Sequence, residues 1–181
     1  MTLPTAVVLD LDGVLADVRH RLHHVSGRPR DWDAFFAAAP RDAALPQGVA
    51  RAVRAAAEGH RVLYLTGRPE RCRADTAQWL DGHGLPAGEL HMRSDTDRRP
   101  ARLVKVGVLR RLSQRLDIRA VVDDDAAVVD AVRALGLPVE HATWMAEQIS
   151  PSTSGSGLAG PEPAGSSQDV LFAVQEREGR T

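Results

Sequence analysis

The sequence predicts an α/β protein, a Rossmann-like three-layer sandwich with a central parallel sheet in the strand order 3-2-1-4-5. Short branched apolar runs alternate along the chain with segments of helical character, as they do in βαβ units. The runs are unbroken rather than alternating with polar residues, which is typical of strands covered on both faces. With 181 residues, 43% of them hydrophobic, the chain is long and apolar enough for one domain with its own core.

Turn-forming residues mark where the expected elements begin and end. Pro46 suits the first turn of a helix, and Gly59 suits the position just past its end. Asp31 is expected to cap a short helix, and Asp125 is expected to act as a helix cap rather than a ligand. Strands are expected at 6–9, 61–65, 89–92, 119–122 and 138–141, and helices over 46–58, 69–81, 101–116 and up to 135.

Reactive side chains follow three of these strands, at the edge of a parallel sheet where ligands bind. They are Asp10 and Asp12 after the first strand, Thr66 and Arg68 after the second, and Asp123 and Asp124 after the fourth. Crowded carboxylates repel one another by about 4 kcal/mol per pair near a protein surface, so they stay ionised only beside a cation. Oxygen ligands without His or Cys favour Mg²⁺, which typically bridges carboxylates to a phosphate. The sequence therefore predicts a magnesium site that takes a phosphate ester.

Other residues near these strand ends suit an anion. Thr66 supplies a hydroxyl, Gly67 allows close approach of the backbone, and a helix beginning at Pro69 is expected to direct unsatisfied N–H groups to the same place. Lys105 is either a compact charge for the phosphate and a nucleophilic carboxylate or a charge on the surface of its helix. With this set, one Asp can attack phosphorus while the Asp two residues later protonates the leaving oxygen.

Composition limits the binding partners and the cellular compartment that we expect for the protein. A net charge of −1 argues against whole-molecule attraction to nucleic acid or to a membrane. The single cysteine, Cys72, cannot form an internal disulfide, and the chain begins without a signal peptide, so we expect a cytoplasmic protein with no membrane partner. Residues 150–181 are expected to be a flexible tail after a domain spanning 1–149, because residues 150–168 are rich in Ser, Gly and Pro.

Four segments, in order, resemble the motifs of the haloacid dehalogenase (HAD) superfamily of phosphohydrolases. They are DLDGVL at 10–15, TGR at 66–68, Lys105 and the pair Asp123-Asp124. The resemblance implies that Asp10 is the nucleophile and Asp12 the general acid and base. It also implies that Thr66 and Lys105 bind phosphate. The Mg²⁺ ligands that it implies are Asp10, the Asp12 backbone carbonyl, and Asp124 with Asp123.

Within the superfamily, the chain is similar to the phosphatase half of polynucleotide kinase-phosphatases. The similar features are the Arg- and His-rich segment after the first motif, TGR, His91-Met92-Arg93, Arg98-Arg99 and the Asp pair. By this likeness Arg21 or Arg19, together with Gly67 and Arg68, contacts the substrate phosphate. That group usually has an Asp four residues before the motif lysine, where this chain has Ala101, and Asp97 is the nearest alternative acid.

The resemblance also bears on substrate and partners. Residues 16–45 leave room only for a small helical cap insertion, so the crevice is expected to admit a nucleotide or a strand end. The basic run 19–30 either lines the crevice or forms a solvated face, and Trp32, Phe35 and Phe36 either stack on a base or pack within the cap. We expect hydrolysis of nucleotide or polynucleotide 3′-terminal phosphates. The alternatives are a phosphatase for a free nucleotide or another small phosphorylated metabolite, and a catalytically weak binding module.

Two other classes are disfavoured by motif order and motif content. In receiver-type signalling domains the acidic pair follows the first strand and the phosphorylated Asp lies on a later one, which is the reverse of the order here. The sequence contains no GxxxxGK[ST] loop, so any kinase activity would belong to a separate partner.

Overall fold

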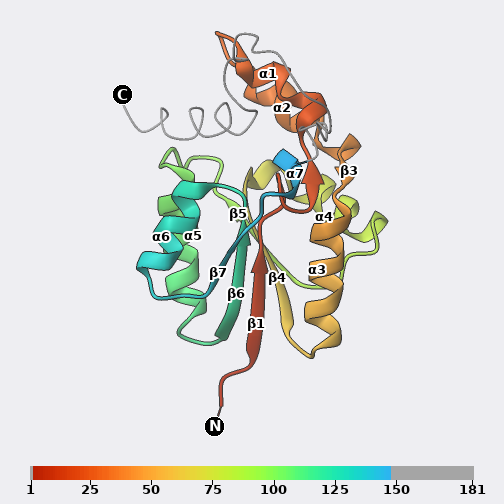
Figure 1. Ribbon diagram of the computed structural model, residues 1–181. Coiled ribbons are helices and arrows are strands. Elements are labelled where there is room, and N and C mark those ends of the chain that lie inside the picture. Colours follow the sequence, from red (N-terminus) through yellow and green to blue (C-terminus); the bar gives the residue numbers. More distant parts are fainter. Residues whose placement is uncertain (1, 148–181) are drawn as a thin grey trace, which may run out of the picture.

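A five-stranded parallel sheet forms the centre of the computed structural model, which describes residues 2–147 (Figure 1). The strands lie in the order β5-β4-β1-β6-β7. Their bounds are β1 (Thr5–Leu9), β4 (Arg61–Pro69), β5 (Glu89–Arg93), β6 (Asp117–Asp123) and β7 (Val139–His141). Counted among themselves, these strands have the order 3-2-1-4-5, so the predicted fold class is confirmed.

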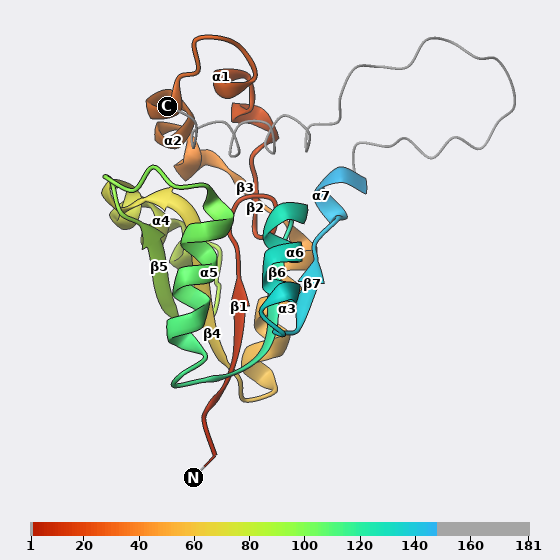
Figure 2. The same ribbon diagram turned by 90° about the vertical axis from the view of Figure 1, so that its left-hand side faces the viewer.

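Helices cover both faces of the sheet (Figures 1 and 2). Helices α3 (Pro46–Ala57) and α4 (Arg73–Gly82) pack on one face, and α5 (Ala101–Leu112) and α6 (Ala126–Ala134) on the other. Val7 and Leu9 of β1 belong to the first apolar layer, whereas Ala6 and Val8 belong to the second. Because β1 is covered on both sides, every position in it after Thr5 needs an apolar residue.

Helix boundaries follow the predicted capping residues. Helix α3 begins at Pro46, and Gly59 past its end has a positive φ of 81°. The carboxylate of Asp125 accepts hydrogen bonds from the N–H groups of Ala127 (2.8 Å) and Val128 (3.3 Å) at the start of α6. Asp31 caps α2 (Trp32–Ala37) in the same way, through the N–H of Ala34 at 2.8 Å. Both predicted Asp caps are confirmed.

The predicted helix start at Pro69 is wrong. Strand β4 continues past Thr66, because Pro69 still pairs with Arg93 of β5. A 3₁₀ turn over Glu70–Cys72 follows, and α4 begins only at Arg73. The backbone N–H of Arg71 donates to the carboxylate of Asp95 at 3.0 Å instead of facing a ligand. The expected anion site at this helix terminus is therefore absent from the described structure. Helix α5 likewise ends at Leu112, before the predicted residue 116.

An insertion between β1 and α3 lies beyond the carboxyl ends of the central strands (Figure 1). It contains the antiparallel pair β2 (Ala16–Asp17) and β3 (Ala43–Ala44), two 3₁₀ turns, α1 (His23–Ser26) and α2. Its own apolar cluster includes Val25, Phe35 and Leu45, together with Met145 of α7 (Trp144–Glu147). Helix α7, which follows the last strand, therefore helps to hold the insertion, called the cap below, against the sheet.

Within residues 2–147 no helix is both long enough and apolar enough to cross a membrane. The tail predicted for residues 150–181, with its apolar stretch 170–174, lies outside the described residues.

Candidate active site

Three buried carboxylates meet where β1 and β6 end. Strands β1 and β6 are parallel neighbours, and their register pairs Leu9 with Val122, so Asp10 and Asp123 leave the sheet side by side. One oxygen from each of Asp10, Asp123 and Asp124 lies within 4.8 Å of the others. All three residues are buried. The structure thus brings together the acidic residues that the sequence placed at two separate strand ends.

Lys105 of α5 joins two of these carboxylates. Its Nζ lies 2.7 Å from Asp10 Oδ2 and 2.6 Å from Asp123 Oδ2. The residue is only 3% exposed, which rules out the alternative of a charge on the helix surface. Asp10 and Asp123 therefore anchor Lys105 although Ala101 replaces the acid usual in the resembling group. The carboxylate of Asp97 is bound to the guanidinium of Arg99 instead, at 2.6 Å.

The carboxylate cluster holds more negative charge than Lys105 neutralises. Burial raises the pKa of Asp10, whereas the charge of Lys105 lowers it. The negative charges of Asp123 and Asp12 raise it again, and the resulting pKa of Asp10 is about 7. Burial, and then the charges of Asp10 and Asp123, raise the pKa of Asp124 well above its usual range. Burial disfavours the charged form of Lys105, but Asp10 and Asp123 outweigh it and raise the lysine pKa. A divalent cation that prefers oxygen ligands, such as Mg²⁺, fits this donor set.

Glycine is required at position 13 by the close approach of Asp124. Gly13 has a φ of +82°, a conformation that side chains other than glycine rarely adopt. A Cβ at this position would lie 2.0 Å from Asp124 Oδ2. The glycine that follows Asp12 in the first motif thus leaves room for a carboxylate from the other strand.

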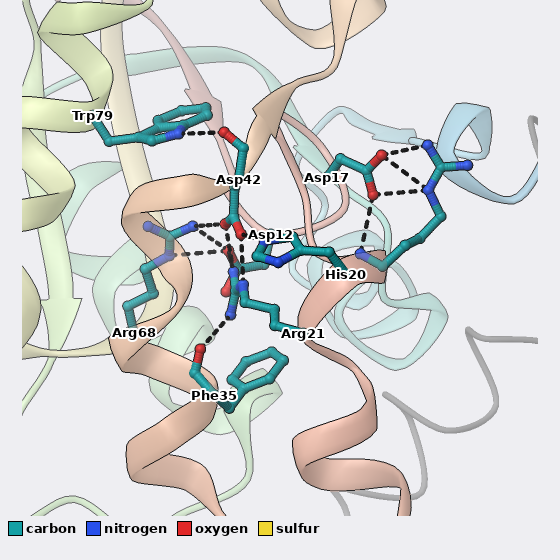
Figure 3. Close-up of polar contacts among 9 residues, drawn as sticks. Asp12, Asp17, His20, Arg21, Phe35, Asp42, Arg68 and Trp79 are labelled. Atoms are coloured by element: carbon teal, nitrogen blue, oxygen red, sulfur yellow. Dashed lines mark hydrogen bonds and ion pairs between the residues drawn. The ribbon is translucent and has the colours of Figure 1, made fainter.

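Asp12 is not one of the three clustered carboxylates and instead binds two arginines (Figure 3). Its Oδ1 accepts hydrogen bonds from Arg21 Nη2 at 2.7 Å and from Arg68 at 3.0 Å (Nε) and 2.6 Å (Nη2). Burial raises the pKa of Asp12, but the two guanidiniums outweigh it and bring the pKa to about 2. The Asp12 side chain is therefore ionised in this arrangement.

Asp42 completes the arginine network and was missed by sequence reasoning. It binds Arg21 through both carboxylate oxygens, and its Oδ2 accepts a further hydrogen bond from Arg68 Nη2 at 2.8 Å (Figure 3). Its backbone carbonyl accepts the indole N–H of Trp79 at 2.9 Å. Asp42 lies in the cap, 32 positions after Asp10, and no motif around it marks it. Its role follows only from folding of the cap over β4.

Arg19, Thr66 and Gly67 were also expected to bind the phosphate, but the three residues have different surroundings. Arg19 binds Asp17 through its guanidinium, at 2.8 and 2.9 Å, and does not line the cavity described below. The Thr66 hydroxyl accepts the backbone N–H of Arg68 at 3.1 Å, and Thr66 is buried. Gly67 does line the cavity, and a Cβ there would meet no atom within 4 Å. The basic run 19–30 is therefore neither one solvated face nor one binding surface, since Arg21 is fully buried and Arg28 is exposed.

A cavity of about 610 Å³ opens above the carboxylates, between the sheet and the cap. Asp10, Asp12, Lys105 and Asp124 line it on the side of the sheet. The cap contributes apolar and aromatic side chains on the other side, namely Val25, Trp32, Phe35 and Phe36, with Met145 from α7. Charged cap residues, among them Arg30, Asp31 and Asp33, line it together with these apolar side chains. The cavity therefore joins a charged end suited to a phosphate with a mixed apolar and charged end for the rest of an ester.

The chain is similar to known phosphatase domains. Residues 4–143 match the family described as polynucleotide kinase PNKP phosphatase domain. The Pnkp1/Rnl/Hen1 complex matches with a TM-score of 0.65 and 27% identity, over 77% of this chain and 45% of that chain. A class C acid phosphatase from Bacillus anthracis matches with a TM-score of 0.58 and 20% identity, over 75% of this chain and 63% of that chain.

A third solved structure is the D,D-heptose 1.7-bisphosphate phosphatase from B. bronchiseptica, complexed with magnesium and phosphate. It matches with a TM-score of 0.51 and 19% identity, over 75% of this chain and 78% of that chain. The class C acid phosphatase and the heptose bisphosphate phosphatase are only 20% and 19% identical to this chain, so these two matches show a shared fold and no more. The chain spans less than half the length of the Pnkp1 chain that it matches. A search of curated proteins finds no match.

Proposed function

Because the chain belongs to the family of polynucleotide kinase PNKP phosphatase domains, HAD-type hydrolases of phosphate monoesters, we propose that it removes 3′-terminal phosphates from polynucleotides. The observation that carries this proposal is the grouping of Asp10, Asp123 and Asp124 at the sheet side of the cavity, with Lys105 bound to the first two. These groups offer a nucleophile, ligands for a divalent cation and a positive charge for the phosphate in one place.

In the proposed reaction, a carboxylate oxygen of Asp10 attacks the phosphorus of the ester. A bond forms between that oxygen and phosphorus, the bond between phosphorus and the sugar oxygen breaks, and Asp12 gives the sugar oxygen a proton. A water molecule then attacks the phosphorus of the aspartyl-phosphate while Asp12 takes a proton from it, and the bond between phosphorus and the Asp10 oxygen breaks. Inorganic phosphate leaves, Asp10 is again a free carboxylate, and Asp12 loses the proton to solvent once Arg21 and Arg68 bind it again.

Arg21 and Arg68 connect substrate binding to Asp12. In the substrate-free protein both guanidiniums donate to Asp12, and both are held in place by Asp42. Both arginines are buried and neither lines the cavity, whereas Asp12 does. Guanidinium binds phosphate as well as carboxylate, but the Asp12 side chain would have to move aside for a phosphate dianion to take over these N–H groups. Loss of these contacts favours protonation of Asp12, which the first step requires.

The metal site is proposed to hold Mg²⁺ through Asp10 and Asp124, with Asp123 and the Asp12 backbone carbonyl. Asp123 already binds Lys105, whereas within residues 2–147 the Asp124 carboxylate accepts no hydrogen bond, so we propose Asp124 as the main ligand from β6. Magnesium bound there would stabilise the charge that develops on the phosphoryl oxygens.

A polynucleotide end is favoured over a small ester by the family to which the chain belongs. The relative Pnkp1 is part of an RNA repair complex with Rnl and Hen1, so an RNA 3′ end is our first choice of substrate. The volume of about 610 Å³ exceeds what a phosphate group alone would occupy. These 181 residues contain no GxxxxGK[ST] loop, so we propose no kinase activity for them.

Hydrolysis of three esters tests the proposal. A 3′-phosphorylated oligoribonucleotide, a nucleoside 3′-monophosphate and a sugar phosphate are compared, each with Mg²⁺ and with EDTA. We expect phosphate release that depends on Mg²⁺, a higher kcat/KM for the oligonucleotide, and loss of turnover in Asp10→Asn. Asp130→Asn, which changes an exposed carboxylate paired with Arg133, is the matched control.

Three results would contradict parts of the proposal. Equal or better turnover of the mononucleotide or the sugar phosphate would assign a small-metabolite phosphatase. Full activity in Asp10→Asn would remove the assigned nucleophile. Binding of the oligonucleotide without turnover of any ester would identify a catalytically inactive binding module.

A further inference from the structure

Two aromatic side chains of the cap line the cavity without a role in the arginine network. Trp32 and Phe36 are both half-buried, and their ring centroids lie 5.9 Å apart with 25° between the ring planes. Phe35, in contrast, is buried, and the Arg21 guanidinium lies 4.1 Å above the centre of its ring. The Arg71 guanidinium lies 6.0 Å from the centre of the Phe36 ring, farther than Arg21 from Phe35. Trp32 and Phe36, called the aromatic pair below, are the half-buried rings that line the cavity.

Arg30 lines the same cavity and has no hydrogen-bond acceptor among the described residues. Of the other cations that line the cavity, Lys105 binds two carboxylates, Arg71 binds Asp33 at 2.8 Å, and Arg93 Nη1 lies 3.5 Å from the carbonyl of Asp97. Arg30 makes no hydrogen bond or ion pair within residues 2–147, although its Nε is buried. Arg98 also has no such partner in this range, but it is exposed to water. A buried N–H donor without an acceptor is costly, so it calls for a ligand.

We propose that this cap side of the cavity is a strand subsite, in which the base of a 3′-terminal nucleotide stacks on Trp32 and Phe36 and Arg30 binds the adjoining internucleotide phosphate. The inference rests on the proposed function, since the terminal phosphate must lie at Asp10. Stacking on aromatic rings tolerates any base, because every base has a π face. A guanidinium suits a phosphodiester, which it binds through several N–H donors. The subsite thus recognises a single-stranded polynucleotide end without reading its sequence.

The aromatic half of the subsite is tested with paired substrates. One is a trinucleotide with a 3′-phosphate, and the other is the same trinucleotide with an abasic 3′-terminal residue. Wild-type protein is expected to show a kcat/KM about tenfold higher for the first. Trp32→Ala and Phe36→Ala should each lower kcat/KM for the first by about tenfold and leave the second within about twofold.

Val53→Ala, on the exposed surface of α3, is the control. Trp32→Phe and Phe36→Leu keep more of the packing and should lose less activity than the alanine variants. An equal loss on both substrates, or no preference of the wild type for the base, would overturn this half of the proposal.

The Arg30 half is tested by removing the internucleotide phosphate. Arg30→Gln should lower kcat/KM for the trinucleotide about tenfold but not for a nucleoside 3′-monophosphate, which lacks that phosphate. Its slope of log kcat/KM against log salt should become shallower by about 0.7, the value for one phosphate contact on a single strand. Arg28→Gln changes an exposed neighbour outside the cavity and should leave both unchanged. An equal loss on both substrates would contradict the assignment.

Binding measurements separate failure of this inference from failure of the proposed function. If wild-type protein hydrolyses none of the esters, the proposed function fails. Calorimetric titration of the wild type and of Trp32→Ala with the two trinucleotides then still reports on the subsite. A preference for the base that Trp32→Ala abolishes would support the subsite, and the same affinity for both trinucleotides would overturn it.

Discussion

Asp42 accepts two hydrogen bonds from the guanidinium of Arg21, from Nε to Oδ1 and from Nη2 to Oδ2, both at 2.7 Å, and neither side chain is exposed to solvent. Asp42 also binds Arg68, so one carboxylate from the cap orients two arginines, from the cap and from β4, toward Asp12. Two guanidiniums are thus buried against the carboxylates of Asp12 and Asp42. Removing any one of these four groups would leave a buried charge without one of its partners.

Asp42→Asn is expected to impair both stability and turnover. The variant leaves two buried guanidiniums with one carboxylate between them, and breaking a buried ion pair costs about 3–5 kcal/mol. We therefore expect a clear fall in Tm, and a loss of kcat/KM greater than about tenfold because Arg21 and Arg68 lose their orientation. Thermal unfolding and phosphate release measure the two effects, with Asp130→Asn at an exposed ion pair as control. A variant with wild-type Tm and activity would show that Asp42 does not position the arginines.

Gly13→Ala is expected to weaken metal binding beyond its effect on the backbone. An alanine Cβ would meet Asp124 Oδ2 at 2.0 Å, so Asp124 must move. Gly59→Ala is a matched control, because Gly59 has nearly the same φ, 81°, but open space around the added Cβ. The left-handed backbone should cost about 1–2 kcal/mol in both variants. Only Gly13→Ala should lower the affinity for Mg²⁺, measured by calorimetric titration. Equal affinity in the two variants would mean that Asp124 is no ligand.

Magnesium is expected to stabilise the fold through Asp124. An ion that binds only the folded protein raises Tm as its concentration exceeds the Kd. Asp124→Asn should abolish this rise, and without Mg²⁺ it should unfold no earlier than wild type, since it removes a charge next to Asp10 and Asp123. Asp125→Asn keeps a residue that can cap α6 and should keep the response to Mg²⁺. Scanning calorimetry with Mg²⁺ and with EDTA checks these results, and a normal Mg²⁺ response in Asp124→Asn would refute the site.

Ala101→Asp is expected to leave turnover nearly unchanged. Lys105 already lies within 2.7 Å of Asp10 and Asp123, so a further acid has no vacant position to fill. Ala101 is 2% exposed, so an introduced carboxylate would be buried and should lower Tm. We expect kcat/KM within about threefold of wild type, a small change in barrier height. A gain of about tenfold or more would show that the acid absent at this position limits catalysis.

Local patterns were sufficient for most of the fold. Branched apolar runs such as Ala6–Leu9 identify strands buried on both faces, and Asp31 and Asp125 mark helix starts because a side-chain oxygen satisfies N–H groups a few residues away. The sequence prediction ended β4 too early, because the end of this strand is set by contacts with a distant segment rather than by local residues. Whether Thr66 to Pro69 stays extended depends on pairing with β5, which is 24 positions further along at Arg93.

The residues of the proposed site divide in the same way. Asp10, Asp12 and Asp124 could be predicted to lie close together because parallel strands bring their carboxyl ends to one edge of the sheet. Lys105 lies on α5 and was predicted from its charge and from the motif that it resembles. Asp12 nevertheless points to two arginines rather than joining the carboxylate group. The partners of the Asp12 side chain depend on where the folded cap places Arg21, and no local sequence pattern predicts that position.

By itself the sequence determined the sheet, its order and the acidic strand ends, because these follow from periodicity and from short-range capping. Only the tertiary structure decided that Asp42 holds the arginines, that Lys105 lies between two carboxylates, and that Trp32 and Phe36 face a cavity. Ion pairs and cavities form between segments far apart in the chain, and their geometry exists only once the cap has packed on the sheet.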